Sequence, residues 1–258
     1  GMTKPLLIAD GLTKRYGGVT ACDKVSFSLD EGEVLAIVGE SGSGKSTLLN
    51  MLACRLAPDI GDVRYRMRDG ETRNLAGLSE AERRLLMRTD WGFVHQDAAQ
   101  GLRMNVSAGG NIGERLMAIG GRNYGGIRHA AADWLSRVEI DTSRMDHKPT
   151  TYSGGMRQRL QIARNLVTSP RLVFMDEPTG GLDVSVQARL LDLIRGLVAD
   201  MGLAVVLVTH DLAVARLLSH RILVMKNGHV IEAGLTDRVL DDPQAPYTQL
   251  LVSSVLAA

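Results

Sequence analysis

Several stretches of the chain are continuously apolar, among them residues 34–38, 172–175 and 204–208. Runs of this length are typical of strands that are buried on both faces of a parallel sheet. Apolar residues recur at helical spacing in residues 186–197 and 211–218, so predicted strands and helices alternate along the chain. This alternation predicts an α/β fold with three layers, in which helices cover a mostly parallel sheet.

Two further patterns predict strands with other surroundings. Residues 24–29 alternate polar and apolar side chains with a period of two, as in a strand with one covered face. Near the end of the chain, residues 222–225 and 229–231 flank Asn227-Gly228, a dipeptide that favours the type I′ turn of a hairpin. From about residue 97 to residue 151 the strand signal fades while helical spacing persists, in residues 111–119 and 128–138, which indicates a helical insertion.

The composition is that of an ordinary globular protein. The 258 residues are 45% hydrophobic and 23% charged, and the net charge of +1 gives no overall attraction to nucleic acid. No apolar stretch approaches the roughly 20 residues that a membrane span requires, and no secretory signal pattern is present, so we expect a cytoplasmic protein. Cys22 and Cys54 lie far apart in the sequence, so we expect reduced, buried thiols instead of a disulfide or a cysteine-based metal site.

A glycine-rich segment follows the first continuously apolar run. Residues 39–46 read Gly-Glu-Ser-Gly-Ser-Gly-Lys-Ser, which matches the phosphate-loop pattern in full, and a helical run follows in residues 47–52. Backbone N–H groups and the positive end of a helix dipole suit phosphate oxygens. We expect Lys45 to reach the β- and γ-phosphates of a nucleotide, and the Ser46 hydroxyl to bind Mg²⁺. The predicted nucleotide-binding residues here are Gly39, Glu40, Ser41, Gly42, Ser43, Gly44, Lys45, Ser46 and Thr47.

Two carboxylates end another apolar run. Asp176 and Glu177 directly follow residues 172–175, at the sheet edge where open α/β folds bind their ligands. Taken alone, such a pair is an ordinary solvated strand end, but a phosphate loop in the same chain favours a catalytic role. We expect Asp176 to hold Mg²⁺ and Glu177 to orient and polarise the attacking water, because phosphoryl transfer depends on positioning and charge stabilisation.

A second predicted anion site lies at the start of a later helix. Residues 152–159 read Tyr-Ser-Gly-Gly-Met-Arg-Gln-Arg, so Ser153 and the amides of Gly154 and Gly155 stand at a helix N-terminus. Taken alone, Ser-Gly-Gly is a common helix cap. One chain cannot fold this segment onto its own phosphate loop, so a second subunit should supply it.

Together these segments resemble the ATP-binding-cassette (ABC) ATPases over about residues 6–251, although Tyr152 and Met156 stand where the commonest signature sequence has Leu and Gln. The resemblance implies roles for four further residues. Gln96 would sense Mg²⁺ and water, and Asp183 would lie in the loop that crosses the dimer interface. His210 would contact the γ-phosphate and hold Glu177 in position. Adenine would stack on Tyr16.

The resemblance also implies a fold, cofactors and an assembly. The fold is the P-loop NTPase domain of ABC proteins, with a mixed, mostly parallel sheet, an antiparallel β subdomain and an inserted helical subdomain. The ATP-binding core and its antiparallel subdomain would comprise residues 1–96 and 158–235, the helical subdomain residues 97–157, and a C-terminal appendage residues 236–258. ATP and Mg²⁺ are the implied cofactors. Hydrolysis would require a head-to-tail dimer of the chain with itself or with a paralogous ABC ATPase.

The segment after Gln96 separates members of the family. Oligopeptide and nickel importer ATPases have a similar tail to residues 242–251, but they typically carry a proline after the aspartate and a Ser-Leu-Asn-Pro run, which is absent from residues 97–105. In residues 91–97 and 174–187 the chain instead resembles the K-type ATP-binding proteins of the bacterial carbon–phosphorus lyase system. This resemblance implies a soluble ATPase that docks on lyase core subunits in phosphonate degradation, without transport or a nucleic-acid partner.

Two other interpretations stay open. In the first, the chain is the ATPase subunit of an oligopeptide or nickel importer, bound to membrane permease subunits and therefore peripheral to the membrane. In the second, it is a nucleotide-dependent scaffold without turnover, which the presence of Glu177 and His210 argues against. The sequence also leaves open whether the dimer forms from identical chains, and what motion the ATPase cycle drives.

Overall fold

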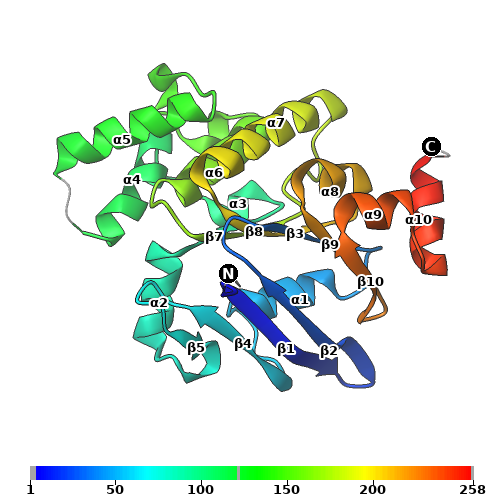
Figure 1. Cartoon of the computed structure of the whole chain (residues 1–258). Helices are drawn as coiled ribbons and strands as arrows, with labels where there is room; N and C mark the ends of the chain where they lie inside the picture. The colour runs from blue at the N-terminus through cyan, green and yellow to red at the C-terminus, as the bar shows by residue number, and fades with distance from the viewer. Residues whose placement is uncertain (1–3, 121–122, 257–258) are drawn as a thin grey trace. The chain divides into compact units, whose positions relative to one another are not determined.

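A computed structural model describes residues 4–120 and 123–256 of the chain (Figure 1). The chain divides into two compact units, each of which is described by itself. The first unit comprises Gly1–Arg83 and Gly202–Ala258, and the second comprises Arg84–Met201. The division into core, helical subdomain and appendage stays a prediction, and residues 1–3, 121–122 and 257–258 of those parts lie outside the described residues.

The first unit contains an antiparallel sheet with the strand order β2-β1-β4-β5. Its strands are β1 (Leu7–Tyr16), β2 (Val19–Leu29), β4 (Ile60–Arg66) and β5 (Thr72–Asn74). In β2, Val25 and Leu29 are buried while Lys24 and Ser26 are exposed, because successive side chains of a strand point to opposite faces. The alternation predicted for residues 24–29 is therefore confirmed.

Four other strands of the first unit lie side by side in the order β10-β9-β3-β8. They are β3 (Val34–Val38), β8 (Ala204–Thr209), β9 (Arg221–Lys226) and β10 (His229–Leu235). Strand β3 pairs in parallel with both β8 and β9, and every residue of β3 and β8 is buried. Strands β9 and β10 form an antiparallel hairpin, with φ of 50° at Asn227 and 82° at Gly228. Both predicted apolar strands and the predicted hairpin are confirmed.

The helices of the first unit are α1 (Lys45–Leu52), α8 (Leu212–Leu218), α9 (Thr236–Asp241) and α10 (Pro246–Leu256), with a 3₁₀ turn at Leu75–Gly77. Helix α2 (Glu80–Thr89) begins in the first unit and ends in the second. Helix α8 begins after Asp211, whose carboxylate accepts a hydrogen bond from the Ala213 N–H at 2.9 Å. Asp211 is therefore the cap of the predicted helix, since its side chain satisfies a donor that the helix leaves unpaired.

The second unit contains the parallel pair β6 (Trp91–Val94) and β7 (Leu172–Asp176) and most of the helices. The predicted helical insertion is confirmed as α3 (Ala98–Gly101), α4 (Ala108–Ala118) and α5 (Tyr124–Arg137), followed by 3₁₀ turns at Thr142–Arg144 and Pro149–Thr151. Helices α4 and α5 begin three or four residues earlier than their apolar spacing indicates, because Ser107 and Asn123 cap them. Helices α6 (Gly154–Leu166) and α7 (Val184–Met201) complete the unit.

The cysteines differ from each other in burial. Cys22 is fully buried, and burial raises the pKa of its thiol to about 12. Cys54 is only half-buried, so the prediction of two buried thiols is wrong for this residue, which lies just after α1. Neither cysteine forms a disulfide within residues 4–120 and 123–256.

In the same part of the chain, no helix combines the length and the apolar character that crossing a membrane requires.

Candidate functional site

The phosphate loop joins the buried strand β3 to helix α1 in the first unit. Its backbone turns through positive φ at Gly39, Gly42 and Gly44, with values of 154°, 81° and 97°. A side chain at Gly39 would collide with the Met225 carbonyl oxygen, and one at Gly44 would collide with the Ala21 carbonyl oxygen. Only glycine fits both positions, because neighbouring backbone lies where a Cβ atom would stand.

The polar groups of this loop suit a phosphate ligand. The Lys45 side chain is buried, and its Nζ donates hydrogen bonds to the carbonyl oxygens of Gly39 at 2.6 Å and Glu40 at 2.9 Å. Within the described residues, no side chain caps α1, and the buried Ser43 Oγ has no hydrogen-bond partner. The first N–H groups of a helix need acceptors, so this end of α1 is a suitable seat for an anion.

His210 emerges from the sheet beside the phosphate loop. Strands β3 and β8 are parallel neighbours, and Val38 is in register with Thr209. The residues that follow this pair, Gly39 and His210, therefore leave adjacent strands at the same edge of the sheet.

Tyr16 ends β1 with 52% of its surface exposed, and the Lys14 ammonium lies 5.6 Å from its ring centre. Its exposed ring is available for stacking.

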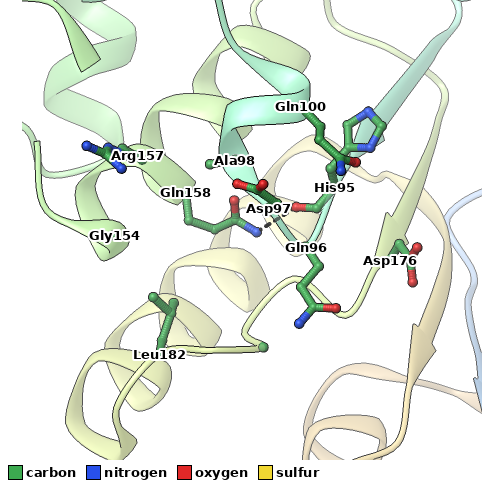
Figure 2. Close-up of a pocket in the computed structure, with 11 residues that line it drawn as sticks. His95, Gln96, Asp97, Ala98, Gln100, Gly154, Arg157, Gln158, Asp176 and Leu182 are labelled. Carbon is green, nitrogen blue, oxygen red and sulfur yellow. Dashed lines mark hydrogen bonds between the residues drawn. The ribbon is translucent and has the colours of Figure 1, made fainter. Parts of the chain in front are cut away.

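The second unit has a cavity of about 460 Å³ at the end of β6 and β7 (Figure 2). Its lining includes Gln96, Asp97, Gly154, Asp176 and Leu182, so residues predicted from separate motifs meet at one place. The Gln96 side chain packs over the backbone at Gly180, where a Cβ atom would lie 2.7 Å from Gln96 Nε2. The close approach of the glutamine to this loop therefore depends on glycine.

Glu177 has an unusual backbone conformation. Its φ is 46°, in the left-handed region that non-glycine residues rarely adopt, and such residues cluster at functional sites. The turn that it begins is closed by a hydrogen bond from the Gly180 N–H to the Glu177 carbonyl oxygen at 2.9 Å. The side chain of Glu177 is half-buried, as is that of Asp176.

The signature segment opens α6 as predicted. Ser153 Oγ accepts a hydrogen bond from the Met156 N–H at 3.2 Å, so Ser153 is the helix cap. A Cβ atom at Gly155 would lie 2.7 Å from Val186 Cγ1, which explains why glycine stands where α6 meets α7. Asp183 caps the start of α7, which lies on the other side of this contact. Hydrogen bonds from the Val186 N–H and the Ser185 hydroxyl lower the pKa of the Asp183 carboxyl. The anion-binding role of this segment stays a prediction.

A row of buried amides lies on α6 and was not predicted from the sequence. Gln158, Gln161 and Asn165 are at most 7% exposed and lie on one face of the helix. Gln158 Nε2 donates to the carbonyl oxygens of His95 at 3.0 Å and Pro178 at 2.7 Å, which adjoin Gln96 and Glu177. The signal that could have revealed these amides is their three- and four-residue spacing after the predicted helix start at Ser153, which places them on one face of that helix.

The other two amides bind β6 and the residue that follows it. Gln161 Oε1 accepts from the His95 N–H at 2.7 Å, and Asn165 Oδ1 accepts from the Phe93 N–H at 2.8 Å. A side chain at Gly101 would collide with Gln161, so α3 also packs closely against this row. The row therefore joins the start of the signature helix to the two segments that carry Gln96 and Glu177.

We expect the change Gln158→Leu to lower the free energy of unfolding by about 2 to 4 kcal/mol, because it removes this donor from the Pro178 carbonyl oxygen and one of the two donors to the His95 carbonyl oxygen. Urea denaturation followed by circular dichroism measures the loss. The matched control is Gln100→Leu, whose exposed side chain should change stability by less than about 0.5 kcal/mol. Equal losses in the two variants would show that the row does not hold the unit together.

Comparison with known proteins places these features in a family. A family model described as ABC transporter matches residues 22–180, which is more than half of the chain. The chain belongs to the ABC transporter family. It is accordingly an ABC-type ATPase, and the resemblance and the fold class predicted from the sequence are both confirmed.

The relatives that match nearly the whole of this chain are of two kinds. The phosphonates utilization ATP-binding protein PhnK of Escherichia coli strain K12 is 65% identical over 255 residues, which cover 99% of each chain. The dipeptide transport ATP-binding protein DppD of the same organism is 36% identical over 97% of this chain and 78% of its own length.

Among solved structures, the ATP-binding cassette MJ0796 in its dimeric post-hydrolysis state, bound to ADP and Pi, aligns with a TM-score of 0.78 and 31% identity. The alignment covers 90% of this chain and 99% of that one. Another dimeric structure of MJ0796 aligns with a TM-score of 0.79 and 32% identity.

Proposed function

We propose that this ABC ATPase drives a carbon–phosphorus lyase complex in phosphonate degradation through nucleotide-dependent closure of a dimer. The observation that carries the proposal is the 65% identity to PhnK over 99% of both chains, against 36% to DppD. The segment of residues 97–105, which lacks the run typical of importer ATPases, supports the same assignment. Lyase core subunits are then the partners, and the cassette moves them without transporting a substrate.

In this proposal the phosphate loop of residues 39–47 binds the phosphates of ATP, with Lys45 on the β- and γ-phosphates. Tyr16 stacks on adenine. Glu177 orients and polarises the attacking water, and His210 contacts the γ-phosphate and holds Glu177 in place. The row of amides helps to position Glu177 and Gln96, since Gln158 donates hydrogen bonds to the backbone carbonyl oxygens next to both. Charge stabilisation and positioning suffice for phosphoryl transfer.

Ser46, Asp176 and Gln96 are the proposed ligands of Mg²⁺. Their side chains offer oxygen atoms, which Mg²⁺ prefers. This donor set fits a cation that keeps waters and shares substrate phosphates. When bound, Mg²⁺ would neutralise charge on the transferred phosphoryl group.

Two observations support a dimer. Both similar solved structures of MJ0796 are dimeric, and Ser153, Gly154 and Gly155 stand at the beginning of the 13-residue helix α6. We propose that these groups bind the γ-phosphate held by another subunit, with Asp183 at the interface, in a head-to-tail dimer. The second subunit is either an identical chain or a paralogous ABC ATPase.

Growth on a phosphonate tests the lyase assignment. In a bacterium whose own copy is deleted, we expect the wild-type chain to restore growth on methylphosphonate as the sole phosphorus source, and Glu177→Gln to fail. Both strains should grow equally on inorganic phosphate. The control Glu71→Gln, which makes the same change at an exposed side chain, should grow like wild type.

Native affinity purification separates this assignment from import. The tail in residues 242–251 and the identity to DppD favour an importer subunit as the second candidate function. The tagged chain, purified with ATP and Mg²⁺, should carry lyase core subunits identified by mass spectrometry. Recovery of membrane permease subunits, together with unimpaired growth of the deletion strain on methylphosphonate, would replace the lyase proposal with the importer.

A further inference from the structure

The tail around Pro246 has no part in the function proposed above, yet it reaches the phosphate loop. Helix α10 begins at Pro246, so Tyr247 lies in its first turn. The Glu40 N–H, in the phosphate loop, donates a hydrogen bond to the Tyr247 hydroxyl at 3.2 Å. Both residues belong to the first unit, and they are separated by 207 positions in the sequence.

With this hydrogen bond, both polar atoms of one peptide group of the loop are bound. The peptide between Gly39 and Glu40 has its carbonyl oxygen bound by Lys45 Nζ at 2.6 Å and its N–H bound by Tyr247. A peptide group is planar, so holding both of its polar atoms sets the orientation of the loop backbone at this point. Gly39 itself restricts that orientation little, because glycine has access to a wider range of backbone angles than other residues.

The ring of Tyr247 and the turn before it are held independently of this hydrogen bond. The Lys226 ammonium, at the end of β9, lies 5.0 Å from the centre of the Tyr247 ring. The Glu232 carboxylate, on β10, accepts hydrogen bonds from the N–H groups of Gln244 at 2.9 Å and Ala245 at 2.8 Å. Burial opposes the ionisation of Glu232, but hydrogen bonds, chiefly from these two N–H groups, together outweigh it and its pKa is lowered. Glu232 therefore anchors the start of α10 as a carboxylate at neutral pH.

We propose that Tyr247 is a positioning residue of the phosphate loop, through which the C-terminal helix α10 sets the affinity for nucleotide. The inference rests on the proposed function of the loop as the nucleotide-binding segment. Without the hydroxyl, the Glu40 N–H turns to water and the loop samples other orientations, so the nucleotide must order the loop as it binds. The turnover number is unaffected, because Tyr247 contributes no group to the reacting phosphate.

The variant Tyr247→Phe removes the hydroxyl and keeps the ring beside Lys226. We expect the Kd for ADP with Mg²⁺, measured by isothermal titration calorimetry, to rise about three- to tenfold, the loss of one hydrogen bond. The KM for ATP should rise by a similar factor while kcat stays within about twofold of wild type. Glu232→Gln, which weakens the anchor of the turn, should shift affinity in the same direction.

Two controls accompany these variants. Tyr124→Phe removes a hydroxyl from an exposed tyrosine in the second unit and should leave Kd, KM and kcat unchanged. Lys45→Ala tests the loop itself, so retained ADP binding in that variant would overturn the proposed nucleotide site. If Lys45→Ala abolishes binding while Tyr247→Phe binds ADP like wild type, or loses kcat at unchanged affinity, the role assigned to Tyr247 is wrong.

Discussion

Replacing Glu177 with Gln should lower the steady-state rate of ATP hydrolysis by about a hundred- to a thousandfold, the effect typical of losing a general base. The change keeps the size of the side chain and removes its charge, so the attacking water is no longer polarised. ATP binding should persist, because the phosphate loop is intact. A phosphate-release assay at saturating ATP measures the loss directly.

The same variant should accumulate a dimer. If closure holds two ATP molecules and hydrolysis reopens the dimer, blocking hydrolysis traps the closed state and shifts the population toward it. Light scattering with ATP and Mg²⁺ should then report twice the mass of one chain, and ADP should return the monomer. Glu71→Gln is the matched control and should hydrolyse ATP at the wild-type rate. Equal phosphate release by wild type and Glu177→Gln would remove the catalytic assignment, and release at the background rate by both would favour a scaffold without turnover.

Removing the charge of Lys45 should abolish nucleotide binding at ordinary concentrations. Lys45→Ala deletes an ammonium that we place on the β- and γ-phosphates, and two charge-assisted hydrogen bonds correspond to about a hundredfold or more in affinity. Titration with a non-hydrolysable ATP analogue, followed by calorimetry, measures the change. The expected result is a Kd too weak to determine in the variant.

Lys45→Ala also affects the stability of the loop, because Lys45 Nζ donates hydrogen bonds to the carbonyl oxygens of Gly39 and Glu40. Thermal melting without nucleotide separates the two effects. A folded variant that does not bind supports the assignment, whereas nucleotide affinity equal to wild type contradicts it. Lys148→Ala, at an exposed position of the second unit, removes the same charge elsewhere and should bind like wild type.

Local sequence patterns predicted most of the strands, helices and turns. The apolar runs in residues 34–38 and 204–208 become the buried parallel neighbours β3 and β8, since a strand covered on both faces needs apolar side chains at every position. The Asn227-Gly228 turn is confirmed for an equally local reason, because positive φ at both residues suits that dipeptide. Helix starts were placed less well, as at α4 and α5, because the caps Ser107 and Asn123 precede the apolar spacing.

The phosphate loop, the acidic pair and the signature segment were each recognisable because their chemistry depends on adjacent residues. Their assembly was not recognisable in the same way. That Gln96, Gly154 and Asp176 line one cavity follows from the packing of α6 against β6, which depends on buried amides whose partners lie at least 20 positions away in the sequence. A buried glutamine and a solvated one look alike in a sequence, because only the surroundings distinguish them.

By itself, the sequence determined the family and the α/β class and predicted the segments that carry the chemistry, because each depends on short-range patterns of glycine, charge and apolar residues. Only the tertiary structure decided which buried amides bind the segments that carry Gln96 and Glu177, and that the tail returns to the phosphate loop through Tyr247. Contacts of this kind join residues that are distant in the chain. Their existence depends on the distances and burial that folding creates, and no local pattern encodes those quantities.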